Sequence, residues 1–158
     1  MPTATYIALA NLTLSSADAE VEFSSIPATY RDLVLVINAN TASSGNAGKI
    51  QVNGDTTAGN YTSVRMVGSS GGAASNTNAD TIRWEASASS NNLIIVNFMD
   101  YSATDKHKTV LVRANANAAT VEASANRWAS TSAITSFKVY YGYNFSAGST
   151  FALYGIVS

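Results

Sequence analysis

The chain has 158 residues, a formal net charge of −1, one histidine, no cysteine and only 12% charged residues. The absence of cysteine excludes stabilisation by disulfides, and the scarcity of charged groups argues against acid–base, nucleophilic or metal chemistry. A nearly neutral chain has no long-range field to attract nucleic acid or an anionic membrane surface, and no stretch approaches the roughly 18 apolar residues of a membrane helix. We therefore expect no nucleic acid, no membrane and no cofactor as partners.

Short apolar segments joined by loops of Ser, Asn, Gly, Thr and Ala run through the whole sequence. They are too short for ordinary helices and are rich in β-branched and aromatic residues, which predicts strands. In chain order the expected strands lie within residues 3–14, 20–26, 33–40, 49–52, 60–67, 81–86, 93–101, 106–115, 119–128, 133–141 and 149–157. This pattern predicts an all-β, antiparallel two-sheet β-sandwich, jelly-roll-like, with about ten strands in a single domain over residues 1–158.

Turn residues predict how some of these strands are connected. The clearest hairpin joins residues 93–101 to 106–115 through the short polar segment 102–105. Asn53-Gly54-Asp55 predicts a second hairpin after the strand at 49–52, because Asn and Gly tolerate positive φ.

Two segments depart from the strand pattern. Residues 68–80 contain no large apolar side chain, so we expect a long surface loop there. Residues 114–125 are rich in alanine and are the one helix candidate. Their Asn, Thr and Ser content and the lack of an apolar stripe disfavour a helix.

Few side chains are placed for catalysis. Glu85 on a strand face and Asp100 at a strand end form a geometrically possible glycosidase pair, although surface or turn roles fit each better. His107 has no local partner for a catalytic triad, and no loop has the oxygen-ligand spacing of a calcium site. The segment 106–108 is the one basic cluster, and we interpret it as the solvated start of a strand. We expect no catalytic, cofactor-binding or metal-binding residue.

Aromatic residues are the stronger candidates for binding. They are Tyr61, Tyr101, Trp128, Tyr140, Tyr141 and Tyr143. Aromatic faces beside Asn or Asp side chains suit sugars, whereas packing in the core or across strands is the competing interpretation. Because Tyr140 and Tyr141 are consecutive, they must point to opposite faces of their strand, so we expect at least one to be exposed or at an interface.

Two segments carry a family resemblance: FSSIPATYRDLVL at residues 23–35 and NFSAGSTFALYGI at 144–156. They resemble small β-sandwich virion proteins of tailed bacteriophages, among them capsid decoration proteins and related domains of tail fibres. Asp100-Tyr101-Ser102 and the WxSTxAI pattern at 128–134 fit the same family. The resemblance covers nearly the whole chain as scattered motifs. It implies a fold and a virion setting, and it carries no site residue over to this chain.

The resemblance implies a non-enzymatic virion protein, made in the host bacterial cytoplasm, that decorates or cements the head. Its expected partners are major capsid protein subunits and further copies of itself in a homotrimer. The chain begins with Met, shows neither a signal peptide nor a coiled-coil or collagen-like shaft, and so favours a stand-alone decoration protein over a fibre. The alternative is a tail-fibre or host-recognition module that binds surface glycans through exposed aromatic residues.

Overall fold

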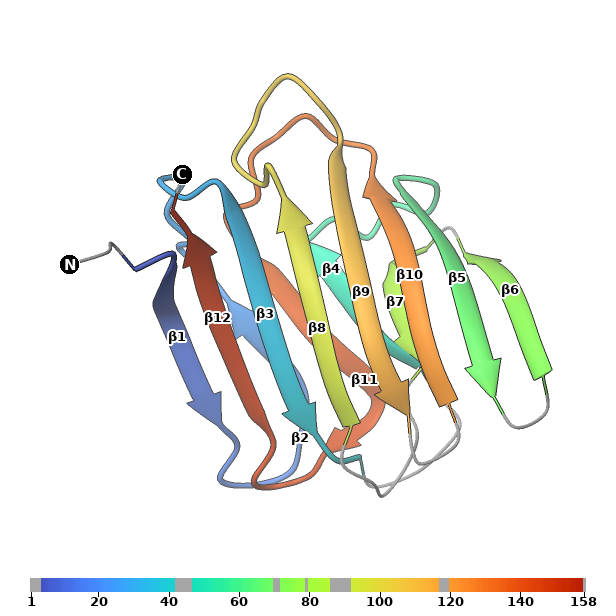
Figure 1. Ribbon diagram of the computed structural model, residues 1–158. Coiled ribbons are helices and arrows are strands. Elements are labelled where there is room, and N and C mark those ends of the chain that lie inside the picture. The colour runs from blue at the N-terminus through green and yellow to red at the C-terminus, as the bar shows by residue number, and fades with distance from the viewer. Residues whose placement is uncertain are drawn as a thin grey trace.

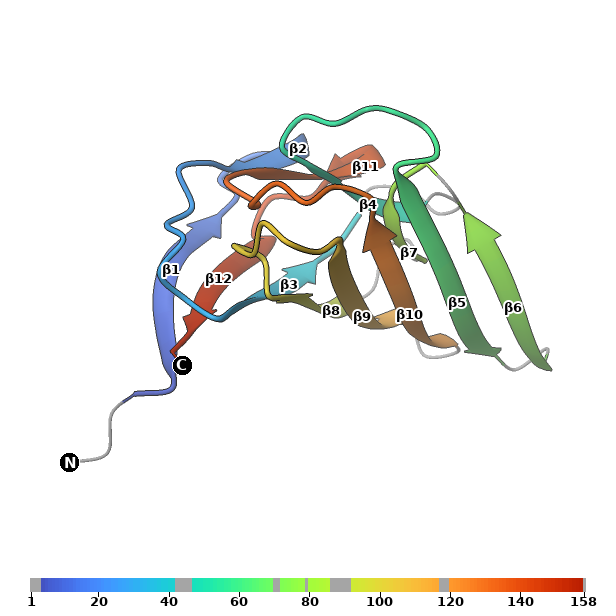
Figure 2. The ribbon, with the colours of Figure 1, turned by 90° about the horizontal axis from the view of Figure 1, so that it is seen from above.

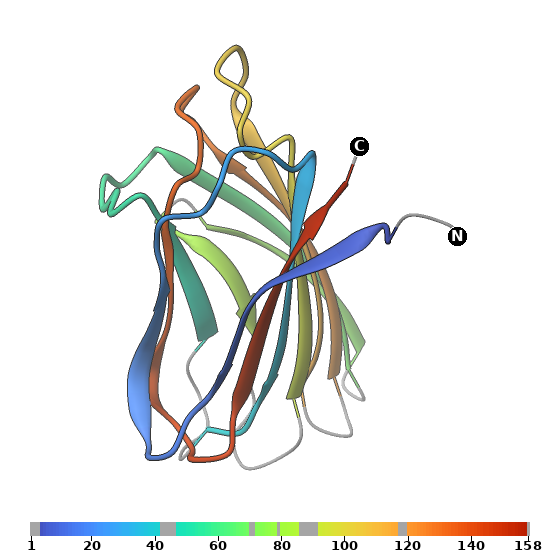
Figure 3. The same ribbon diagram turned by 90° about the vertical axis from the view of Figure 1, so that its left-hand side faces the viewer.

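A computed structural model describes residues 4–41, 47–69, 72–78, 80–85, 92–116 and 120–157. These residues form two antiparallel sheets packed face to face (Figures 1 and 3). The larger sheet has eight strands in the order β1 (Tyr6–Thr13), β12 (Thr150–Ile156), β3 (Asp32–Ala39), β8 (Asn92–Met99), β9 (Lys108–Ala116), β10 (Thr120–Trp128), β5 (Tyr61–Ser69) and β6 (Gly72–Asn78). The smaller sheet has four, in the order β2 (Asp18–Phe23), β11 (Phe137–Phe145), β4 (Ala47–Val52) and β7 (Ile82–Glu85). The prediction of an all-β two-sheet sandwich is confirmed.

The strand pairing is nested along the chain. β1 pairs with β12, β2 with β11, β3 with β8 and β4 with β7. With the hairpin strands β5, β6, β9 and β10 set aside, each sheet has four strands. Pairing of the first strand with the last, the second with the next to last, and so on inward is the jelly-roll arrangement.

Two inserted strand pairs enlarge one sheet only. β9 and β10 lie between β8 and β11 in the chain, and β5 and β6 lie between β4 and β7. All four strands add to the same edge of the larger sheet, which continues from β8 through β9, β10 and β5 to β6. Figure 2 shows this extension passing beyond β7, at the edge of the smaller sheet.

The core lies between the two sheets and follows the strand alternation. Leu33, Leu35 and Ile37 of β3 are fully buried, and so are the inward side chains of β8. Across the core, the rings of Phe98 and Phe137 stack with centroids 4.9 Å apart. Side chains alternate between the two faces of a strand, so every second residue of these strands points into the core.

The prediction of a surface loop over residues 68–80 is wrong for residues 68–69 and 72–78, which form strands; residues 70–71 and 79 lie outside the described ranges. β5 continues to Ser69, and β6 at Gly72–Asn78 pairs with it in register, for example Val67 with Ala74. β6 is the last strand of the sheet, so the backbone ladder with β5 can hold it without large apolar side chains. The sequence signal for strands, apolar periodicity, is missing from such a segment.

The expected turn at Asn53 and Gly54 forms, with φ of 50° and 68°, but the predicted hairpin does not. β4 pairs with β11 and β7, and after the turn the chain crosses to β5 in the other sheet. The Asn53 side chain explains the crossing, because it binds the segment before β11: its Nδ2 donates to the Ala133 carbonyl at 2.8 Å, and its Oδ1 accepts from the amide of Thr135 at 2.9 Å.

Other local predictions have mixed outcomes. The hairpin of β8 and β9 is confirmed, and β10 pairs with β9 on the other side. The described parts of the helix candidate, residues 114–116 and 120–125, lie in β9 and β10, so the helix is excluded there. The strand expected at 133–141 forms later, as β11, and it lies in the smaller sheet beside β2 and β4.

Candidate interaction surface

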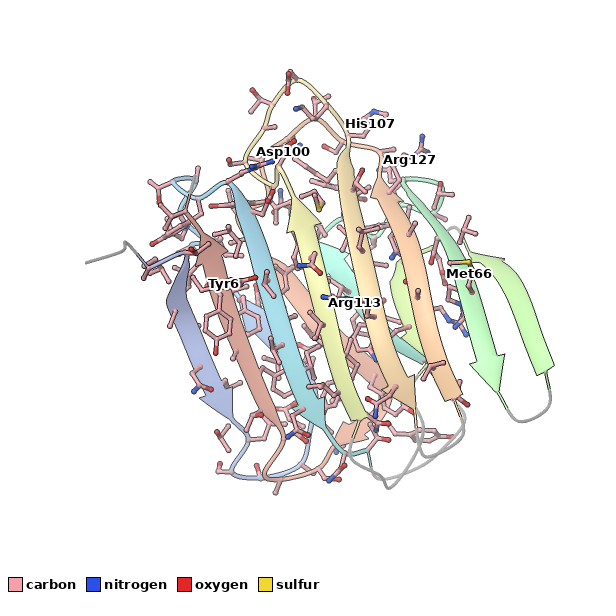
Figure 4. The ribbon with its side chains drawn as sticks, in the orientation of Figure 1. Tyr6, Met66, Asp100, His107, Arg113 and Arg127 are labelled. Carbon is pink, nitrogen blue, oxygen red and sulfur yellow. The ribbon has the colours of Figure 1, made fainter. Side chains whose placement is uncertain are left out.

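The outer face of the larger sheet carries exposed apolar side chains. In an antiparallel sheet with one solvated face, outward positions are usually polar. Here Met66 is 67% exposed, Val121 65% and Val64 47%, and Leu93 and Leu111 are also exposed. These side chains come from β5, β8, β9 and β10, and in Figure 4 this face is turned toward the viewer. An apolar face on a sheet that has already filled its core on the other side indicates a contact surface.

Strand register places Val64, Leu111 and Met66 in two rows across the sheet. One row runs from β5 to β1 through Val64, Ala125, Leu111, Asn97, Val34, Tyr154 and Ala8. The neighbouring row runs through Met66, Ala123, Arg113, Ile95, Val36 and Ala152. The first row is interrupted by one amide, that of Asn97, and the second by one cation, that of Arg113.

A shallow groove runs along β10, because its outward residues are small. Ala123 and Ala125 lie between the longer side chains of β5 and β9. The groove has a volume of about 430 Å³, and its walls include Val64, Met66 and Leu111. A second hollow of about 400 Å³ lies on the same face, lined mainly by Leu93, Ile95, Arg113, Asn115 and Val121. We call the two hollows together the β10 groove surface.

Arg113 is the cation at the centre of this surface and lines both hollows (Figure 4). Its cross-strand neighbours are Ile95 and Ala123, both uncharged. Within the described ranges, no carboxylate lies at ion-pair distance from Arg113. Arg127, nearer the end of β10, donates to the Thr62 hydroxyl at 3.4 Å.

Acidic groups on the same face lie at its margin and are already bound. Asp32, at the start of β3, accepts the backbone N–H of Asp100 at 2.8 Å and lies 3.7 Å from the Arg31 guanidinium. Asp100 in turn lies 3.4 Å from the Lys106 ammonium. The centre of this outer face, as far as the structure describes it, is therefore mainly apolar and carries the positive charge of Arg113.

The inner face of the extension is polar, and its groups stabilise the fold. Arg65 and Glu122 form a buried ion pair at 3.8 Å. Asn126 and Ser124 bind the outer edge of β7: Asn126 Oδ1 accepts the Arg83 N–H at 3.4 Å, and the Ser124 hydroxyl donates to the Arg83 carbonyl at 3.3 Å. Side chains of one sheet thus satisfy the edge of the other, where a further strand could otherwise pair.

Asp55 joins the turn after β4 to the end of β10. Its Oδ2 accepts from Trp128 Nε1 and Asn60 Nδ2, both at 2.8 Å, and its Oδ1 accepts the Thr57 N–H at 2.9 Å. These hydrogen bonds, that of Trp128 foremost, lower the pKa of Asp55 to about 2. The Tyr61 hydroxyl donates to the Asp55 carbonyl at 2.9 Å. Trp128 and Tyr61 are therefore bound within the fold and offer no face to a sugar.

The remaining aromatic candidates are only partly available. Tyr101 is fully buried; its hydroxyl donates to the Pro27 carbonyl, and burial raises its pKa. Tyr141 is buried against Phe145, whereas Tyr140, on the opposite face of β11 as expected, is half-buried beside two lysines. Tyr143 is 43% exposed. The aromatic residues proposed for sugar binding therefore do not form one exposed platform.

The basic cluster after β8 is divided by the fold. Lys106 and His107 are exposed, but Lys108 is buried. The prediction that residues 106–108 form the solvated start of a strand is therefore wrong for Lys108. Its ammonium group donates to the carbonyls of Lys106 at 3.0 Å and Thr131 at 3.3 Å, which offsets its burial. Desolvation lowers the pKa of Lys108.

The possible carboxylate pair is not assembled. Glu85 pairs through its backbone with Ala47 at the start of β4. Asp100 lies at the other end of the sandwich, where its backbone N–H donates to the carboxylate of Asp32 at the start of β3. The described residues contain no group of three or more acidic or histidine side chains suited to a metal ion. They also contain no helix with the length and hydrophobicity to cross a membrane.

The sequence contains one signal for this surface, and it lies outside the aromatic residues. Leu93-Ile94-Ile95-Val96 and Val110-Leu111-Val112 are apolar at consecutive positions, which places apolar side chains on both faces of their strands. No family model matches this chain, and no curated protein matches it in sequence.

Proposed function

We propose that this protein is a non-enzymatic structural protein of a tailed-phage virion that decorates or cements the assembled head. The observation that carries the proposal is the apolar outer face of the eight-stranded sheet, which suits burial against other proteins. The jelly-roll topology supports it, since this architecture is common among viral capsid domains. The motifs at 23–35 and 144–156 support the phage setting.

The protein would act by mass action. A protein that binds the assembled shell, and not the free capsid subunits, shifts the equilibrium away from disassembly by an amount set by its affinity and concentration. The proposal includes a homotrimer, in which contacts between copies cover sheet edges. β1 and β6 are the two edge strands of the larger sheet, and each has one side without a neighbour in the described chain.

The test uses the virus whose genome encodes the chain. We expect the protein to copurify with heads, and heads from a strain lacking its gene to break at lower temperature and at low ionic strength. Adding the purified protein back to those heads is the control and should restore their stability. Absence of the chain from purified particles, or an unchanged lifetime of heads without it, would contradict the proposal. Copurification with tails instead, together with binding to a glycan array, would favour the host-recognition alternative.

A further inference from the structure

We propose that the β10 groove surface is the site at which this protein binds its partner. The partner is a protein other than this chain, and it presents a large aliphatic side chain and a carboxylate. This inference rests on the proposed function, which makes the partner a major capsid protein subunit. It assigns the contact to one face of the sandwich and specifies the chemistry of the partner's surface.

The shape of the groove specifies an aliphatic contact. The two alanines of β10 form a floor about two side chains long, and Val64, Met66 and Leu111 rise on either side. A branched or long aliphatic side chain would fill this space and remove the exposed walls from water. A flat or polar surface would leave the groove empty.

Arg113 specifies the charge of the partner. Once a partner covers the groove, the guanidinium between Ile95 and Ala123 loses access to water, and a covered charge without a counter-ion is strongly unfavourable. A carboxylate opposite Arg113 would restore its interactions through a bidentate pair and would also fix the register of the complex.

The same charge argues against a second copy of this chain as the occupant. Two copies stacked on this face about a twofold axis near the groove centre would bring their Arg113 guanidinium groups together. Asp32, whose position on β3 faces outward, lies at the margin of this face. Its carboxylate already binds the Arg31 side chain and the backbone N–H of Asp100. Contacts within a trimer would use the edges at β1 and β6, which leaves this face available.

The experiment measures binding of the purified chain to heads prepared without it. Two variants change the surface: Ala125→Gln fills the groove floor, and Arg113→Glu reverses the central charge. Arg113→Lys keeps the charge. Two controls match them elsewhere: Ala147→Gln adds the same bulk in the exposed turn between β11 and β12, and Lys138→Glu reverses a half-buried charge on the smaller sheet. All four positions lie outside the core, and melting curves confirm that each of the five variants is folded.

We expect the affinity for heads to fall at least about tenfold for Ala125→Gln and for Arg113→Glu, as for central interface residues. Arg113→Lys should retain most of the affinity, and both controls should bind like the wild type. If the wild type binds heads and the two surface variants bind equally well, the inference is wrong and the proposed function stands. Failure of the wild type to bind heads overturns both. A change in the mass of the free protein caused by Ala125→Gln or Arg113→Glu would show that a second copy covers this face, which also overturns the inference.

Discussion

Asp55 shows how a single acidic residue in this chain serves the fold. Its two oxygens accept three hydrogen bonds, two from its own loop and one from Trp128 at the end of β10. These hydrogen bonds hold the segment between β4 and β5 against the end of β10. Because all three partners donate hydrogen bonds, they favour the ionised carboxylate and lower the pKa of Asp55 to about 2.

The first prediction concerns removal of that charge. Asp55→Asn should lower the free energy of unfolding by about 1–3 kcal/mol at neutral pH, the usual cost of losing hydrogen bonds to a charged acceptor. An amide presents one acceptor oxygen and an NH₂ group that cannot accept from Trp128 or Asn60. Urea denaturation measures the effect. Asp105→Asn, at an exposed loop position, is the matched control and should change stability by less than about 0.5 kcal/mol.

The second prediction is the pH dependence of the same contribution. The pKa of Asp55 is about 2 in the folded chain against an ordinary value of 3.8, so its contribution is fully present above pH 3.8 and is lost as the pH falls toward about 2. The difference in unfolding free energy between wild type and Asp55→Asn should therefore narrow across that window. A difference that stays constant down to the lower limit would show that charge on Asp55 is not the cause.

At the scale of elements, the structure depends on close contacts between strands and aromatic rings. A Cβ atom placed on Gly155 of β12 would lie 2.4 Å from Cγ of Tyr30, and one on Gly48 of β4 would lie 2.1 Å from Cε2 of Trp84. Both contacts are shorter than any real Cβ contact, so these strands carry glycine where a ring lies directly on the backbone.

The third prediction follows from the Tyr30 contact. Gly155→Ala should destabilise the protein by about 1–3 kcal/mol through overpacking, because the ring must move away from β12. In the background of Tyr30→Ala the same substitution should cost much less, and thermal unfolding of the four variants gives the coupling. Equal costs in both backgrounds would place the strain elsewhere on β12.

The fourth prediction concerns the edge of β7. Asn126→Ala removes the side-chain acceptor of the Arg83 N–H and the donor to the Val110 carbonyl, at 3.4 and 3.1 Å. We expect a loss of about 1–3 kcal/mol in stability, the cost of unsatisfied buried groups. Hydrogen exchange at the Arg83 amide should accelerate more than exchange at amides in the centre of β3. Uniform acceleration across both strands would indicate global destabilisation alone.

The sequence predicts those elements that local pattern determines. β8 and β9 have apolar periodicity and a short polar connection, so their hairpin could be foreseen. β6 has no such periodicity, and the crossing after Asn53 depends on hydrogen bonds to residues about 80 positions later. The β10 groove surface was foreseeable only as runs that are apolar on both faces. The positions of Ala125, Val64 and Leu111 opposite one another are set by strand register, which the sequence does not display.

At the scale of the whole molecule, the unequal sheets define the surfaces available for assembly. Four strands cannot cover eight, and both insertions extend the same sheet beyond the smaller one. The nested pairing holds β1 beside β12 at one edge, while the insertions end in β6 at the other (Figure 1). A cyclic trimer joins copies through head-to-tail contacts, so each copy buries two different patches, and the two free edges of the larger sheet are candidates for them.

The fifth prediction is the mass of the protein in solution. If the free edges are covered in a homotrimer, light scattering at micromolar concentration should give three times the chain mass of 16.5 kDa. β6 contains neither lysine nor proline, the residues that commonly protect an exposed edge, so introducing charge there should prevent pairing between copies. The double substitution Ser75→Lys and Thr77→Lys should therefore yield a monomer with a nearly unchanged melting temperature, because β6 lies outside the nested eight-strand core. A monomeric wild type would remove the trimer from the proposal and leave the outer face as the means of binding. A trimer that persists in the double variant would place the contact away from β6.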